Sequence, residues 1–241
     1  LWMLVMTTRF KSYTSNGILS IDSDFRGYAL VGIEKYTGTA GFPSWAIPCA
    51  ADEILVLAES SHPTYVHSYR NGVMLVFTIA DSDRLAGSVI HTANITIYRF
   101  SYKRPTKKGL FNVYTEDGDL AFTSAQPMLR PFRYLQYVEE GNAPPPGYAV
   151  RKSFTDVERF GVVLSPSFRY TESQDVGSYF GHSEDDWQEF YTYCGFIVSG
   201  KDLIVSSFWT QMQEWTIGGY KASMNTGVAP YNTNKILMVY L

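Results

Sequence analysis

"FKSYTSNGILSIDS" (residues 10–23) and "FNVYTEDGDLAFTS" (residues 111–124) are nearly the same pattern, written twice in one chain of 241 residues. Six aligned positions are identical at a constant offset of 101 residues. The identical pairs are Phe10 and Phe111, Tyr13 and Tyr114, Thr14 and Thr115, Gly17 and Gly118, Leu19 and Leu120, and Ser23 and Ser124. Because two aromatic residues recur at a fixed distance from a glycine, the similarity exceeds what turn chemistry requires. We interpret the two stretches as an internal repeat.

Each copy has the pattern of a β-hairpin. Asn16-Gly17 in the first copy and Asp117-Gly118 in the second are dipeptides that tolerate the positive φ angles of tight turns. After each turn, apolar residues alternate with small or polar ones, as in "GILSIDS" and "GDLAFTS". We therefore predict a strand, a turn and a strand in each copy, with these four residues in the turns.

The rest of the chain repeats this kind of signal. Aromatic residues make up 16% of the chain, and such residues pack well on a pleated surface. Further strands are predicted in "DEILVLAE", "GVMLVFTIA", "ANITIYRFSY", "FGVVLS", "CGFIVSG", "DLIVSSFW" and "NKILMVYL". Asn71-Gly72 and the segment 199–202 predict two more hairpins. Many short strands joined by such turns indicate an all-β protein with a β-sandwich-like fold.

The repeat also suggests how the chain is divided. We expect two related β-rich halves, residues 6–104 and 105–241, each opening with a similar hairpin. The predicted boundary lies near "KRPTKKG", where a proline and several basic residues interrupt the strands. In the second half, a Pro-rich loop is predicted at residues 141–147, because its three prolines favour an extended segment.

Charge and the start of the chain narrow the classes of partner. The formal net charge is −3, from 20 Lys and Arg residues against 23 Asp and Glu residues, so we expect no nucleic-acid partner. The apolar start "LWMLVM" is too short to span a membrane, so we expect no membrane insertion, and Met6 would make a natural start that leaves residues 1–5 outside the fold. Cys49 and Cys194 could pair or remain two separate buried thiols.

Reactive motifs do not stand out in the sequence. The chain lacks the sequence patterns of a serine nucleophile elbow, a zinc-binding His-Glu-x-x-His helix, a phosphate-binding loop and a dinucleotide fingerprint. The densest polar stretch, "GHSEDDWQEF" (residues 181–190), is read as an acidic loop. Its carboxylates could hold Ca²⁺, or Glu184 and Glu189 could act as acid and base on a glycan. We expect solvated acidic residues instead, with no catalytic residue, metal or cofactor.

Aromatic residues near the C-terminus offer a binding hypothesis. Trp209, Trp215, Tyr220 and Tyr231 lie in polar, Gly-rich sequence, and exposed Trp and Tyr can stack on sugar rings or anchor a protein interface. The alternative for each is packing in the core.

Two longer segments carry a resemblance to a known family. "TTRFKSYTSNGILSIDSDFRGYALV" (residues 7–31) resembles the opening of β-rich, tail-associated proteins of tailed bacteriophages. "YRFSYKRPTKKGLFNVYTEDGDLAFTSAQPMLRP" (residues 98–131) is similar to the same family's middle element. In this resemblance Gly17 and Gly118 are turn glycines, and "KILMVYL" is a closing C-terminal strand.

The resemblance implies a structural function and no catalytic residues. It indicates a non-enzymatic virion structural protein of the tail tip or tail fibre region, made in the host cytoplasm, with roles in tail assembly and host attachment. The implied partners are other phage tail proteins, and we expect an oligomer or a larger assembly. The alternative hypotheses are a carbohydrate-binding module that recognises a cell-surface glycan or host receptor, and a glycan hydrolase.

Overall fold

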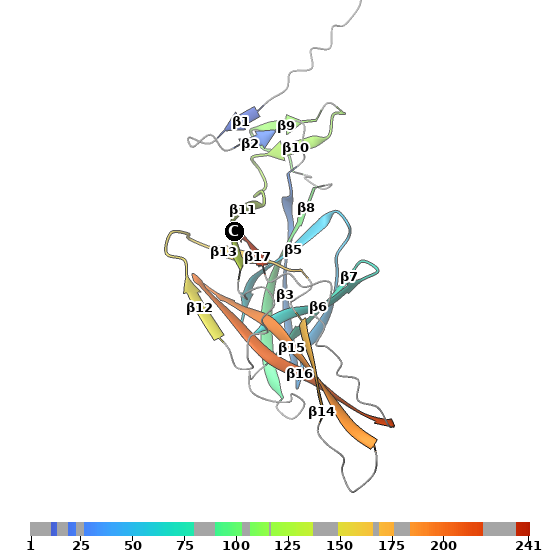
Figure 1. The fold of residues 1–241 in the computed structure, drawn as a ribbon. Helices are drawn as coiled ribbons and strands as arrows, with labels where there is room; N and C mark the ends of the chain where they lie inside the picture. The colour runs from blue at the N-terminus through green and yellow to red at the C-terminus, as the bar shows by residue number, and fades with distance from the viewer. Residues whose placement is uncertain are drawn as a thin grey trace, which may run out of the picture.

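The structure is a computed structural model with nearly all of its described residues in strands and turns. It describes residues 11–13, 19–22, 27–79, 90–102, 107–115, 117–136, 149–165, 169–175, 184–218 and 235–241. Side chains are described for residues 27–79, 90–102, 107–115, 117–135, 150–165, 194–206 and 236–241. The protein is all-β, with two large antiparallel sheets that pack together as a β-sandwich-like fold (Figure 1), which confirms the predicted fold class.

The first sheet is antiparallel and six-stranded, in the order β11-β17-β13-β5-β8-β3. Its strands are β3 (Ala29–Ala40), β5 (Glu53–Ser60), β8 (His91–Ser101), β11 (Arg130–Gln136), β13 (Phe160–Val163) and β17 (Lys235–Tyr240). The edge strand β11 contains Pro131, which fits an edge because proline cannot donate a ladder hydrogen bond.

The second sheet is seven-stranded, in the order β12-β16-β15-β6-β7-β4, with β14 paired to β15 off this path. Its strands are β4 (Ser44–Pro48), β6 (Thr64–Arg70), β7 (Val73–Thr78), β12 (Ala149–Ser153), β14 (Arg169–Asp175), β15 (Glu184–Ser199) and β16 (Asp202–Gly218). In Figure 1 the ribbon formed by β14, β15 and β16 extends away from the sandwich.

Two predicted hairpins of this sheet are confirmed. Asn71 and Gly72 join β6 to β7 with φ angles of 53° and 75°, the two positive values that a tight, right-twisted hairpin turn requires. Gly200 has a φ of 59° in the turn between β15 and β16, where Ser199 pairs with Asp202. The seven strands predicted from branched and aromatic runs are all present in the sheets.

The main core lies between the two sheets. Its buried side chains include Leu55 and Leu57 of β5, Ile97 of β8, and Val66 and Val205 from the opposite sheet. Val56, which alternates with the two leucines, belongs to a second cluster with Phe100 and Val239 on the other face of the six-stranded sheet. The central strand β5 is therefore covered on both faces.

Strands from both predicted halves share this core. The six-stranded sheet combines β3, β5 and β8 with β11, β13 and β17, and the other sheet also mixes strands from both sides of residues 104 and 105. The predicted boundary is therefore not a boundary between two cores, because the strands after it complete sheets begun before it. The Pro-rich loop at 141–147 lies outside the described residues.

The acidic stretch was predicted as a loop, and that prediction is wrong. Residues 184–190 form the first part of β15, which pairs with β16 along this whole stretch and with β14 on the other side from residue 187 onward. Aromatic residues at 187 and 190 give the segment strand propensity, and pairing on both sides supplies the backbone hydrogen bonds that a loop would lack.

Arg99 of β8 joins two carboxylates across three neighbouring strands. Its Nε lies 2.8 Å from Glu34 Oε1 on β3, and its Nη1 lies 2.7 Å from Glu53 Oε2 on β5. The side chain of Glu53 is only 7% exposed. The hydrogen bond from Arg99 lowers the pKa of Glu34, while burial and the hydrogen bond that Tyr36 donates to Glu34 raise the pKa of Tyr36 to about 12.

Arg99→Met should lower the free energy of unfolding by about 3 kcal/mol at neutral pH, because it leaves the buried Glu53 without its cationic partner. The pKa of Glu34 is depressed below 4.5, so its pairing stabilises the fold above that pH and is lost as the pH falls through the lowered pKa. Urea unfolding across this pH range should therefore give a weaker acid dependence for Arg99→Met than for the wild type. An unchanged acid dependence would contradict this assignment.

Cys49 and Cys194 are both free and buried. Burial raises the pKa of each thiol, to about 12 for Cys194. Because the thiolate is the reactive form, we expect both cysteines to react with a disulfide reagent far more slowly in the folded protein than in urea. Equal rates in the two conditions would show that the thiols are accessible.

Candidate functional site

The two repeated sequences form the same hairpin. The first consists of β1 (Lys11–Tyr13) and β2 (Leu19–Asp22), and the second of β9 (Asn112–Tyr114) and β10 (Leu120–Thr123). Every bound of the second hairpin equals that of the first plus 101 residues. The pairing register is also shared: Lys11 faces Asp22 as Asn112 faces Thr123, and both hairpins carry an irregularity at the corresponding step.

Repeated polar residues build the turn and base of the second hairpin. The backbone N–H of Thr115 donates to Asp119 O (2.7 Å), and Thr115 Oγ1 accepts from the N–H of Asp119 (3.2 Å). Gly118 has a φ of 84° in this turn. At the base, Ser124 Oγ accepts from the N–H of Phe111 (3.0 Å). Thr115, Gly118 and Ser124 are all identities of the repeat, so these identities specify backbone geometry.

The second hairpin is attached to the segment that leaves the first. The N–H of Gly27 donates to Ala121 O (3.2 Å), and Ala29 forms a bridge with Met128. Gln126 Nε2 donates to Leu30 O (3.1 Å). Figure 1 shows both hairpins at the same end of the molecule, beyond the sandwich.

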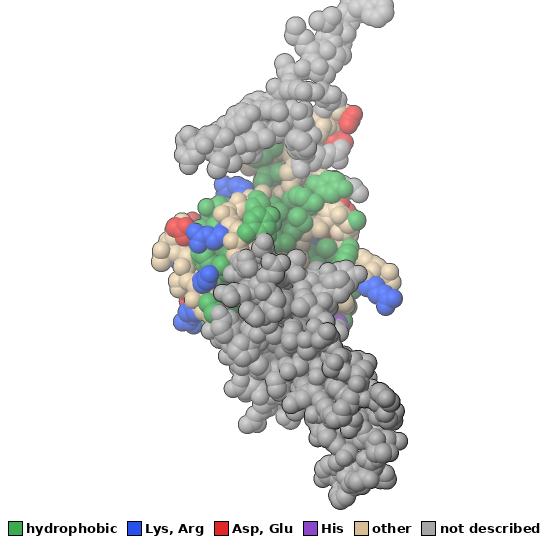
Figure 2. Space-filling view, in the orientation of Figure 1, with side chains coloured by type: hydrophobic (Ala, Val, Ile, Leu, Met, Phe, Trp, Pro, Cys, Tyr) green, Lys and Arg blue, Asp and Glu red, His purple; other side chains and the backbone are tan. Residues whose placement is uncertain are grey.

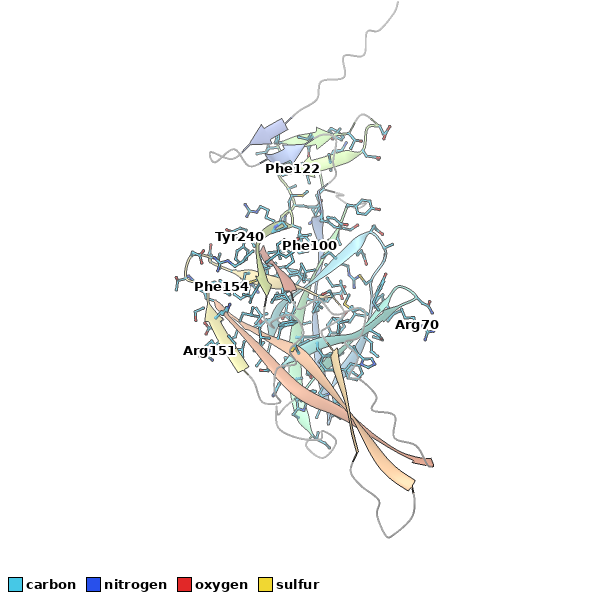
Figure 3. All side chains as sticks on the ribbon, in the orientation of Figure 1. Arg70, Phe100, Phe122, Arg151, Phe154 and Tyr240 are labelled. Atoms are coloured by element: carbon cyan, nitrogen blue, oxygen red, sulfur yellow. The ribbon has the colours of Figure 1, made fainter. Side chains whose placement is uncertain are left out.

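The repeated aromatic residues of the second hairpin lie at its surface. Phe111 is 45% exposed and Tyr114 is 41% exposed, and the neighbouring Leu110 is fully exposed. Phe111 packs beside Phe122 with ring centroids 6.1 Å apart, and Figure 3 shows Phe122 on the hairpin, away from Phe100 and Tyr240 in the sandwich. The hairpin therefore presents an apolar surface next to Lys108, whose Nζ lies 5.9 Å from the Tyr114 ring.

A further apolar surface lies close to the hairpins. Figure 2 shows hydrophobic side chains gathered on the part of the sandwich nearest the hairpins. Tyr134 of β11 and Tyr240 of β17 are 73% and 39% exposed. They lie on opposite faces of the six-stranded sheet, because Tyr134 is paired with Leu237, three residues from Tyr240.

The structure describes some of the predicted turn and binding residues and not others. Asp117 and Gly118 lie in the turn between β9 and β10, whereas Asn16, Gly17, Tyr220 and Tyr231 lie outside the described residues. Trp209 and Trp215 are positions of β16, where Trp209 faces Thr192 and Trp215 faces Trp187. Their glycan-binding role stays a prediction.

The predicted hydrolase pair lies in the same ribbon. Glu184 faces Gly218, and Glu189 faces Gln213 in the register of β15 with β16. Their catalytic role is likewise an untested prediction. Among the residues with described side chains, no group of three or more His, Cys, Asp and Glu side chains could hold a metal ion. No helix in the described ranges is long and apolar enough to cross a membrane.

A cavity of about 450 Å³ that opens to solvent lies on the six-stranded sheet, and its lining mixes polar side chains with Tyr36 and Ile95. Strands β3, β8 and β5 line it, together with Ser199 at the end of β15. The strand register places Lys35, Thr96 and Glu59 in one row across the three strands. Two residues further along, Thr37 and Asn94 form a second row.

Hydrogen bonds organise this second row. Thr37 Oγ1 donates to Asn94 Oδ1 (2.7 Å). The backbone N–H of Asn94 donates to Ser61 Oγ (3.0 Å), which lies 2.9 Å from His62 Nδ1. Sequence reasoning missed this site, because polar residues at alternate positions of a strand are also typical of an ordinary solvated face.

In comparisons with known proteins, no family model, curated protein or solved structure matches the chain.

Proposed function

We propose that the protein is a non-enzymatic structural component of a tailed bacteriophage virion, in the tail tip or tail fibre region, and that its paired hairpins bind neighbouring tail proteins. The sequence resemblance to tail-associated proteins supports this function. The observation that carries it is the duplicated hairpin, which has the same strand bounds and the same register in both copies.

The distribution of the repeated residues supports binding as the role of the hairpins. Repeated Thr, Gly and Ser residues fix the backbone, whereas the repeated Phe111 and Tyr114 place apolar area at the surface of the second copy. Aromatic side chains contribute large contact area at protein interfaces. A fold that only needed a stable hairpin would gain little from keeping Phe111 and Tyr114 exposed in the second copy.

An immunoblot of density-gradient fractions tests this function. The phage that encodes the chain would be banded, and its fractions probed with an antibody to the chain and with one to a known tail protein. We expect the chain in the particle band at a constant ratio to the tail protein across the peak. Its complete recovery among soluble proteins at the top of the gradient would overturn the proposal.

A further inference from the structure

We propose that the open cavity on β3, β8 and β5 binds one or two sugar units of a glycan. None of the described residues that line this site belongs to the hairpins, and the site does not depend on the proposed role in assembly. Its volume of about 450 Å³ falls in the range of small-molecule sites, roughly 300 to 1,000 Å³.

The arrangement of the lining side chains fits a flat ligand with several hydroxyl groups. Neighbouring strands are about 4.8 Å apart, and alternate residues of one strand are about 7 Å apart. The rows of Lys35, Thr96 and Glu59 and of Thr37 and Asn94 therefore form a grid of polar groups with roughly the dimensions of one or two sugar rings.

The chemistry of the grid supplies both donors and acceptors. Asn94 Oδ1 already accepts from Thr37, so the side-chain NH₂ of Asn94 is oriented to donate to a ligand. Lys35 adds a cationic donor and Glu59 an acceptor able to take two hydroxyl protons. Within the described part of the chain, neither Lys35 nor Glu59 forms an ion pair.

Other classes of ligand fit less well. A phosphate would meet one lysine and the repulsion of Glu59, and a metal ion would find one carboxylate beside a cation. An apolar ligand would cover the charged ends of Lys35 and Glu59 without offering either of them a polar partner. A hydroxyl-rich ligand can hydrogen-bond to Lys35, to Glu59 and to the neutral Asn and Thr side chains at the same time.

The test uses the purified full chain on a printed array of bacterial and animal glycans. Saturation-transfer NMR with free glucose, galactose, mannose and N-acetylglucosamine would follow. We expect binding to a subset of the array and saturation transfer to at least one of the free sugars. Glu59→Gln and Asn94→Ala should each weaken array binding about tenfold, which corresponds to about 1.4 kcal/mol.

Matched variants separate this site from the rest of the surface. Glu158→Gln changes another exposed glutamate, and Thr39→Ala changes a threonine two residues beyond Thr37 that does not line the cavity. Both should bind as the wild type does, with all variants showing unchanged thermal unfolding. Absence of binding in both assays would overturn the proposal. So would binding that survives Glu59→Gln and Asn94→Ala, including binding that is lost only in Trp209→Ala.

Discussion

Phe160→Ala is expected to lower the free energy of unfolding by about 3 to 5 kcal/mol, because it removes a large side chain from the centre of the core. Phe160 is fully buried (0% exposed) on β13. Its ring meets that of Phe154 edge-on at 5.2 Å and that of Phe132 at 6.4 Å. The cavity left by alanine cannot be filled without moving both aromatic neighbours.

The core that contains Phe160 also contains side chains from before residue 104, such as Leu57 and Ile97. We therefore expect the variant to unfold in one transition, shifted to lower urea concentration, as monitored by circular dichroism and tryptophan fluorescence. Tyr134→Ala is the matched control: this aromatic residue is 73% exposed, and its loss should change stability by less than about 1 kcal/mol. A separate, unshifted second transition in Phe160→Ala would contradict the single shared core.

If the protein has the proposed function, the double substitution Phe111→Ser and Tyr114→Ser is expected to remove most of the chain from phage particles. If the hairpin surface contacts a neighbouring tail protein, the double substitution removes two aromatic side chains from that interface. Truncating an aromatic side chain at the centre of an interface often lowers the binding free energy by about 2 kcal/mol or more. A combined loss of about 4 kcal/mol corresponds to roughly a thousandfold weaker association. The measurement is an immunoblot of gradient-purified particles after complementation with the variant.

The double variant must still fold, so that its loss from particles can be attributed to the hairpin surface. Both side chains are substantially exposed, so the thermal unfolding of the double variant should stay close to that of the wild type. Tyr134→Ser provides a control, because it removes an exposed aromatic residue outside the hairpins. Normal incorporation of the double variant, beside normal incorporation of the control, would show that this hairpin surface is not the contact.

Strands with strong local signals could be predicted from the sequence. The β-branched and aromatic runs of β5, β7, β8 and β17 decided the fold class, and Asn71-Gly72 and Gly200 fixed two hairpin turns. Strand β3 gave a weaker signal, because Gly32 and Gly38 interrupt it and three of its four exposed positions are polar. Only its pairing with β8 makes it a strand of 12 residues.

The order of the strands in the sheets, and the residues that this order brings together, could not be predicted from the sequence. The repeat predicted matching hairpins but not that the strands after each would enter common sheets, since no local pattern reports strand order. The cavity likewise combines Lys35, Glu59 and Asn94, which come together only through the order β5-β8-β3. The acidic stretch was wrongly predicted as a loop because its many carboxylates suggested solvent exposure. Its pairing with β14 and β16, which makes it a strand, has no signal in the local sequence.

Immunogold electron microscopy tests the proposed function most directly, with an antibody to this chain on phage particles purified from its source. The proposal predicts gold at the tail tip or on the tail fibres, with capsids unlabelled. Particles that stay unlabelled at the tail, while an antibody to a known tail protein labels them, would contradict it.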